Sequence, residues 1–149
     1  MVVILDTDHL TVIQRRAEPA YSRLRARLSK LPPSTVQTTI ISFEEQMRGW
    51  LAVISRVRNQ SKEVVAYQRL QALLRFFNEI PVLDYTEVVA ARFDDLRRLR
   101  LRFGSMDLKI AAIVRRSGIS FSVSGIDQSA PDYQDTLREI FRSASANPR

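Results

Sequence analysis

Apolar residues along the chain fall into short runs of strand length and longer segments with helical spacing. Residues 2–5 form an apolar run that ends at Asp6, and residues 35–41 are rich in β-branched side chains. Runs of this kind predict buried strands. Two further strands are predicted over residues 81–83 and 119–124. The segments between them place their apolar residues at the helical period.

Capping residues divide these segments into helices. We expect helices over residues 8–16, 17–30, 42–57, 61–80, 86–102, 107–117 and 131–143. The expected N-caps are Asp8, Ser42, Ser61 and Thr86, because short polar side chains accept hydrogen bonds from the first backbone amides of a helix. Glu45 follows Ser42 at the spacing of a capping box.

Strands that alternate with helices predict an α/β fold, with an open parallel sheet and helices on both faces. A chain of 149 residues fits one domain, residues 1–149. In such sheets, ligands bind beyond the carboxyl ends of the strands. Polar residues that follow the predicted strands are therefore the first candidates for a functional site.

Composition removes several kinds of chemistry. The chain has no cysteine and a single histidine, His9, which excludes disulfides, zinc–thiolate sites and cysteine nucleophiles. With one histidine in the chain, a multi-histidine metal site cannot form, and a Ser–His–Asp triad would have to use His9. No apolar run approaches the roughly 20 residues of a membrane helix, and no leader peptide is visible. We therefore expect a soluble cytoplasmic protein whose catalysis, if any, uses carboxylates, hydroxyls, lysine or arginine.

The net charge of +7, carried mostly by arginine, favours an anionic partner. That partner can be nucleic acid or an acidic protein, and the two interpretations are compatible. Arginines are dense over residues 97–102. Such a stretch is usually a solvated helix face, but near a catalytic site Arg98, Arg100 and Arg102 could hold phosphates.

Four carboxylates lie where the predicted strands end. Asp6 follows the first strand, Asp8 is two residues further, Glu45 lies one turn into the helix after the second strand, and Asp107 begins a later helix. Converging carboxylates repel one another, and bound Mg²⁺ or Mn²⁺ is the usual relief. Each also has a purely structural interpretation, as a turn, cap or helix-start residue.

Other residues have simpler interpretations. His9 is expected to be a packed or surface residue rather than a catalyst. Trp50 and Phe43 are expected in the core or an interface, with stacking on a base as the alternative. Glu44 faces away from Glu45 on the same helix and is expected to be solvated.

Three stretches together resemble the PIN-domain family. Residues 5–10 (LDTDHL) look like its opening motif, residues 38–50 (TTIISFEEQMRGW) like its second, and residues 104–112 (GSMDLKIAA) like its third. They occur in order and at suitable spacing. In the second motif the acid lies four residues before a glycine, which selects Glu45 over Glu44. The resemblance covers residues 1 to about 124.

This resemblance implies a three-layer α/β/α sandwich around a parallel sheet. It also implies a metal-dependent ribonuclease of the VapC type that is kept silent by a co-expressed antitoxin, and it is compatible with a homodimer. Asp6, Glu45 and Asp107 would be the catalytic acids and the ligands of Mg²⁺ or Mn²⁺, and Asp8 would support them. RNA as the substrate is implied by the family alone.

The chain departs from the family after its last predicted strand. Ser124 can match the hydroxyl residue of the family, and Asp127 is the nearest acid, but the tail from residue 125 does not resemble it. The alternative interpretation is therefore a catalytically impaired PIN-fold protein that binds an antitoxin or RNA. A second alternative comes from residues 6–8, which resemble the start of a haloacid-dehalogenase phosphatase, although Leu10 stands where that motif needs threonine or valine.

Overall fold

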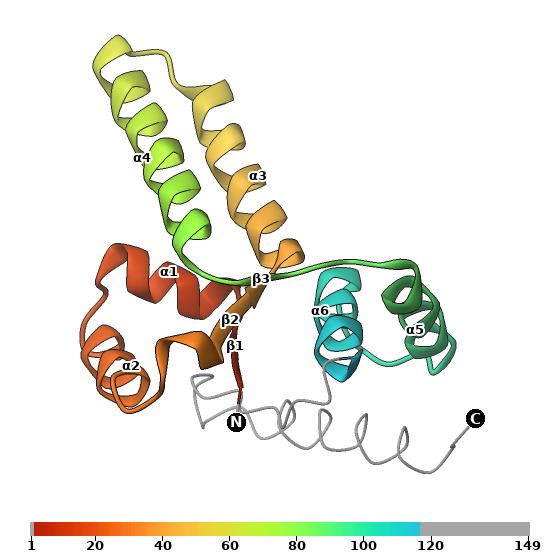
Figure 1. Ribbon diagram of the computed structural model, residues 1–149. Helices are drawn as coiled ribbons and strands as arrows, with labels where there is room; N and C mark the ends of the chain where they lie inside the picture. Colours follow the sequence, from red (N-terminus) through yellow and green to blue (C-terminus); the bar gives the residue numbers. More distant parts are fainter. Residues whose placement is uncertain (1, 117–149) are drawn as a thin grey trace.

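A parallel sheet of three strands lies at the centre of residues 2–116, the part of the chain that the computed structural model describes (Figure 1). The strands are β1 (Val3–Leu5), β2 (Val36–Thr39) and β3 (Val82–Leu83), in the order β1-β2-β3. Val3 pairs with Val36, and Thr38 pairs with Val82. The predicted strand over 119–124 and helix over 131–143, with Ser124 and Asp127, lie outside the described residues.

Helices cover both faces of this sheet, as predicted (Figure 1). One side carries α1 (Thr7–Arg15) and α2 (Ala20–Leu28), and the other carries α5 (Glu87–Arg98) and α6 (Ser105–Arg116). Between them α3 (Ile40–Arg56) and α4 (Gln60–Glu79) project as a long hairpin, and a short 3₁₀ turn, η1 (Pro33–Thr35), precedes β2. The α/β sandwich is confirmed.

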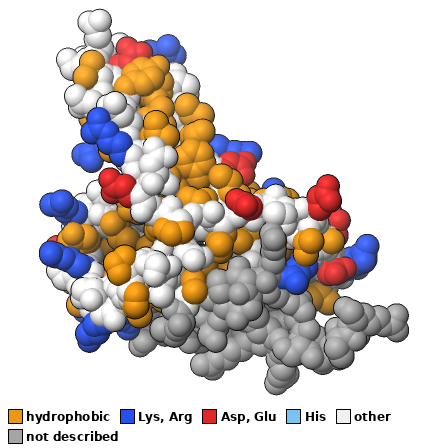
Figure 2. Space-filling model, viewed as in Figure 1, with side chains coloured by type: hydrophobic (Ala, Val, Ile, Leu, Met, Phe, Trp, Pro, Cys, Tyr) orange, Lys and Arg blue, Asp and Glu red, His pale blue; other side chains and the backbone are white. Residues whose placement is uncertain are grey.

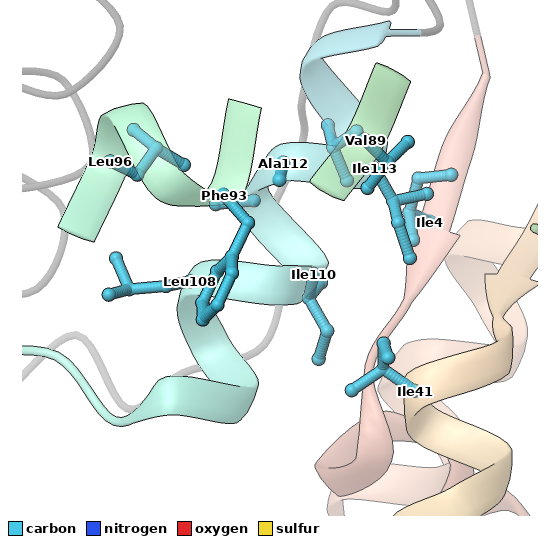
Figure 3. Close-up of a cluster of buried hydrophobic side chains, with 11 residues drawn as sticks. Ile4, Ile41, Val89, Phe93, Leu96, Leu108, Ile110, Ala112 and Ile113 are labelled. Atoms are coloured by element: carbon cyan, nitrogen blue, oxygen red, sulfur yellow. The ribbon is translucent and has the colours of Figure 1, made fainter. Parts of the chain in front are cut away.

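The core has two parts because β1 buries both of its faces. Side chains alternate along a strand, so Val3 and Leu5 point to one side and Ile4 to the other. The first side forms a cluster with Leu10, Leu73 and Phe77 from α1 and α4. The second side packs against α5 and α6 through Ile4, Ile41, Val89, Phe93, Leu96, Leu108, Ile110 and Ile113 (Figure 3).

Apolar side chains also remain exposed along the α3–α4 hairpin (Figure 2). Leu51, Val64, Tyr67 and Leu74 are each half exposed or more. Among residues 2–116, no helix is both long enough and apolar enough to span a membrane.

Two of the predicted caps at the site end of the sheet are wrong. Asp6, not Asp8, caps α1, because its carboxylate accepts a hydrogen bond from the amide of His9 at 3.0 Å. Thr39, not Ser42, caps α3, and its hydroxyl accepts from the Ser42 amide at 3.2 Å. The predicted second strand is therefore two residues shorter at its end. Glu45 is not a capping-box residue and its carboxylate is used elsewhere.

The cap of α4 differs in the same way. Asn59 Oδ1 accepts from the amides of Ser61 and Lys62 at 2.9 Å and 3.2 Å, so Asn59 is the cap where Ser61 was predicted. We expect Asn59→Ala to lower the free energy of unfolding by about 1 kcal/mol. Ser61→Ala should change it by less than about 0.5 kcal/mol. Urea unfolding of both variants measures the difference, and the reverse order of effects would contradict the assignment.

Helix α5 ends at Arg98, four residues before its predicted end. Arg100 has a φ of 50°, in the left-handed region, and the chain leaves the helix there. The sequence predicted a longer helix because its first clear helix break is Gly104-Ser105. Arg98 thus lies in the last helical turn, whereas Arg100 and Arg102 lie in the connection to α6.

Candidate active site

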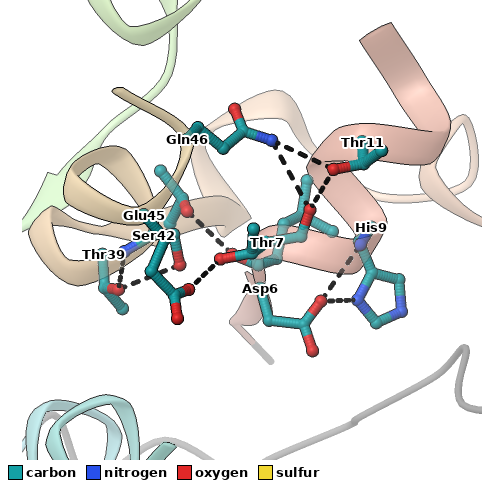
Figure 4. Close-up of polar contacts among 10 residues, drawn as sticks. Asp6, Thr7, His9, Thr11, Thr39, Ser42, Glu45 and Gln46 are labelled. Carbon is teal, nitrogen blue, oxygen red and sulfur yellow. Dashed lines mark hydrogen bonds and ion pairs between the residues drawn. The ribbon is translucent and has the colours of Figure 1, made fainter. Parts of the chain in front are cut away.

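Asp6 lies at the carboxyl end of β1, where it caps α1 (Figure 4). Its Oδ1 accepts from the backbone amide of His9 and also contacts His9 Nδ1. The His9 ring is buried, with 7% of its side chain exposed, whereas 26% of the Asp6 side chain is exposed. His9 is therefore packed, as expected, and its partner is the first candidate acid.

Burial and His9 act in opposite directions on Asp6. Burial raises the pKa of the Asp6 carboxyl, but hydrogen bonds from the His9 ring and backbone, together with the charge of His9, leave that pKa below its usual value. A lowered pKa means that Asp6 is ionised in the folded protein at neutral pH. Its charge is then available to a cation.

Glu45 lies one turn into α3, close to the carboxyl end of β2. Its Oε2 accepts a hydrogen bond from the Thr7 hydroxyl, which joins the residue after Asp6 to the second candidate acid (Figure 4). Glu44 forms an ion pair with Arg48 at 2.5 Å on a solvated part of the helix. The prediction that Glu44 is solvated and turned away is confirmed.

Asp107 is the third residue of α6 and is exposed. Partial desolvation of the Asp107 carboxyl raises its pKa, and a hydrogen bond from the Gly104 backbone lowers it. The negative charges of Asp6 and Asp8 raise the pKa further, so that the net shift is upward. A Cβ atom at Gly104 would lie 3.2 Å from Asp107 Oδ2, so glycine admits the carboxylate there. The negative charges of Asp6 and Asp8 are thus felt at the Asp107 carboxylate, and repulsion of this kind falls with distance.

The raised pKa of Asp107 predicts a stability effect of definite sign. A carboxyl whose pKa is higher in the folded than in the unfolded state destabilises the fold once the pH exceeds both values. We therefore expect Asp107→Asn to raise the melting temperature at pH 7 in EDTA, and the gain to vanish near pH 3. Thermal unfolding of both proteins from pH 3 to 7 tests this, and a gain that does not depend on pH would contradict it.

Carboxylate oxygens are the ligands that Mg²⁺ and Mn²⁺ prefer, so the donor chemistry of Asp6, Glu45 and Asp107 fits such an ion. Within residues 2–116, however, no three His, Cys, Asp or Glu side chains are close enough together to hold a metal. Each of the three acids instead has a contact within the protein, to His9, Thr7 or Gly104. The described residues therefore show Thr7, the neighbour of Asp6, bonded to Glu45, but no group of three acids in position to share one ion.

Arg98, Phe43 and Trp50 have contacts of their own in the fold. Arg98 lies on the exposed face of α5 and pairs with Asp95 at 3.2 Å. Phe43 stacks edge-on against Phe77, with ring centroids 4.9 Å apart. Trp50 packs against the same cluster. Phe43 and Trp50 are thus packing residues, as expected, and Arg98 is a solvated helix residue.

Sequence reasoning did not single out Thr7 or Gln46. Gln46 is buried and donates to Thr11 Oγ1 at 3.3 Å and to the Thr7 carbonyl at 3.5 Å. Its Oε1 accepts from Gln14 at 2.7 Å. The only signal in the sequence was position, because Thr7 follows Asp6 and Gln46 follows Glu45.

Solved structures share this architecture. FitAcB from Neisseria gonorrhoeae aligns with a TM-score of 0.58 and 22% identity over 84% of this chain and 88% of its own. A toxin–antitoxin complex from Klebsiella pneumoniae gives 0.56 and 15% over 89% and 93%. VapC20 from Mycobacterium tuberculosis, described as a toxin that cleaves the sarcin–ricin loop, gives 0.53 and 19% over 87% and 95%. No protein-family model and no curated protein matches the sequence.

These likenesses establish the fold. The chain has a PIN-like fold, shared with proteins of toxin–antitoxin systems. At sequence identities of 15–22%, the likeness shows the fold alone. The chemistry depends on the residues of the site.

Proposed function

We propose that this protein is a metal-dependent endoribonuclease and the toxin of a toxin–antitoxin pair acting in the cytoplasm. The observation that carries the proposal is the hydrogen bond from the Thr7 hydroxyl to Glu45, which brings the residue after Asp6 to the second candidate acid at the carboxyl ends of β1 and β2. The resemblance of the three motifs to PIN-domain toxins and the shared fold support the same conclusion.

Asp6, Glu45 and Asp107 would hold Mg²⁺ or Mn²⁺, with Asp8 adding negative charge nearby. The bound ion would lower the pKa of a water and neutralise charge that develops on the phosphate. Asp6 supplies a carboxylate that is ionised at neutral pH. A carboxylate near the metal would accept the proton of the attacking water. Arg98, Arg100 and Arg102 would contact the RNA backbone.

A cavity lined by two arginines suits an acidic antitoxin. A cavity of about 660 Å³ between α1, α3 and α4 is lined by Arg15, Arg69, Trp50 and Phe76, and no carboxylate lines it. Within residues 2–116 neither arginine forms an ion pair. A cavity lined by apolar and uncharged polar side chains together with two cations would accept a segment that carries an apolar side chain between acidic ones.

Cleavage of a labelled RNA pool by the purified protein tests the proposal. We expect cutting with Mg²⁺ or Mn²⁺ and none with EDTA. Folded protein that leaves RNA intact with either metal would instead favour the catalytically impaired interpretation, in which the PIN-like fold only binds its partner.

A further inference from the structure

The first residue of α1 meets two consecutive residues of α3 at the site (Figure 4). Thr7, which follows Asp6, donates its hydroxyl to Glu45 Oε2. Gln46, which follows Glu45, donates its amide to the Thr7 carbonyl at 3.5 Å. Thr7 is thus the point at which the element bearing Asp6 contacts the element bearing Glu45.

The backbone of Thr7 is held from more than one side. Thr11 Oγ1 donates to the Thr7 carbonyl at 2.8 Å, and Gln46 Nε2 donates to the same Thr11 hydroxyl at 3.3 Å. Gln14 fixes the other end of the Gln46 amide at 2.7 Å. Gln46 is buried, whereas Thr11 and Gln14 are partly exposed, so these bonds are partly shielded from water. They leave the Thr7 hydroxyl little freedom to point elsewhere.

We propose that Thr7 is a positioning residue, whose hydroxyl holds the Glu45 carboxylate in its place beside Asp6. This inference rests on the proposed metal-dependent activity. A glutamate side chain has many rotamers, and fixing one of them before the ion arrives removes a cost from metal binding. The Thr7 hydroxyl engages Oε2, so Oε1 stays available. Hydrogen bonds of this kind to ligating carboxylates orient them and tune the metal.

A purely structural role makes a different prediction. If the Thr7–Glu45 bond only held α1 against α3, its loss would lower stability without a specific effect on metal affinity. The bonds of Gln46 to Thr11 and to the Thr7 carbonyl already join these helices through uncharged groups. Thr7 alone among the described residues is seen to donate to a candidate acid from the partner helix.

Mn²⁺ affinity, measured from the electron paramagnetic resonance signal of free Mn²⁺, is the primary test. Thr7→Val removes the hydroxyl at nearly constant volume, and Thr7→Ser keeps it. We expect Thr7→Val to weaken Mn²⁺ binding about 10- to 100-fold and to lower kcat for RNA cleavage with little change in KM. Thr7→Ser should stay within about threefold of the unmodified protein. Thr35→Val, whose hydroxyl bonds to the Pro32 carbonyl at 2.7 Å in a remote turn, is the matched control.

A double-mutant cycle with Glu45→Gln separates positioning from general damage. In the Glu45→Gln background we expect Thr7→Val to cost much less Mn²⁺ affinity than it does alone. If Thr7→Val fails to fold, Thr7→Cys, a weaker donor, takes its place. Unchanged Mn²⁺ affinity in Thr7→Val, or equal losses in Thr7→Ser and Thr7→Val, would overturn the inference and leave the proposed function intact. If the unmodified protein neither binds Mn²⁺ nor cleaves RNA, the proposed function fails, and this inference with it.

Discussion

Asp6→Asn is expected to abolish metal-dependent RNA cleavage while the protein remains folded. The substitution removes the negative charge that a metal needs at this position but keeps an oxygen that can accept the His9 amide, and asparagine caps helices as well as aspartate does. Loss of one charged ligand should cost several kcal/mol of transition-state stabilisation, which corresponds to roughly a hundredfold or more in rate. Single-turnover cleavage of labelled RNA with Mn²⁺ measures it.

Glu44→Gln is the matched control for that experiment. Glu44 is adjacent to Glu45 in sequence but pairs with Arg48 on a solvated part of α3. Its neutralisation should leave the cleavage rate within about twofold, because an exposed ion pair contributes little. Equal losses in Asp6→Asn and Glu44→Gln would show that net charge, and not the carboxylates at the strand ends, governs the activity.

Leu10→Ala is expected to give the largest loss of stability. Leu10 is completely buried between β1 and the hairpin, in the cluster with Val3, Leu5, Leu73 and Phe77. Truncating a buried leucine to alanine costs about 2–5 kcal/mol, from lost transfer free energy and the cavity left behind. For a chain of this size the melting temperature should fall by roughly 10 °C.

Leu74→Ala, the same truncation at an exposed position of α4, provides the comparison. Leu74 is adjacent to buried Leu73 on α4 but is 56% exposed. Its truncation should change the free energy of unfolding by less than about 0.5 kcal/mol. Differential scanning calorimetry of both variants gives the difference. A similar drop in the two would mean that the hairpin, and not the β1 face, limits stability.

Periodicity alone was sufficient for the order of strands and helices in the described residues and for helices on both faces of the sheet. The choice of Glu45 over Glu44 as the inward acid also followed from the sequence, through the register of the second motif. The first result rests on repeating apolar patterns, in which several residues agree on one answer. The second rests on the resemblance of the second motif to the PIN-domain family.

Helix starts were harder to predict because several short polar residues near each start satisfied the same local rule. Asp6 and Asp8, Thr39 and Ser42, and Asn59 and Ser61 each offered two candidate caps, and the extended backbone of the earlier residue decided the outcome. At the end of α5, the first residues that break a helix by type, Gly104 and Ser105, lie several positions beyond the left-handed Arg100 where the helix has already ended. Local rules do not distinguish such neighbours.

The contacts around Thr7 had no signal in the sequence beyond its position next to Asp6. Thr7 and Glu45 are 38 positions apart, and their hydrogen bond depends on how β1 and β2 align. The pairing of His9 with Asp6 was local in sequence, yet it required the cap to lie at Asp6. Side-chain partners at the site therefore depend on tertiary geometry that composition and spacing do not encode.

The most direct test of the proposed metal site is anomalous X-ray diffraction from a crystal of the full chain soaked in Mn²⁺. We predict an anomalous peak in contact with the carboxylates of Asp6, Glu45 and Asp107. Mn²⁺ bound elsewhere, or no ordered Mn²⁺ beside these three residues at a concentration that supports RNA cleavage, would contradict the account.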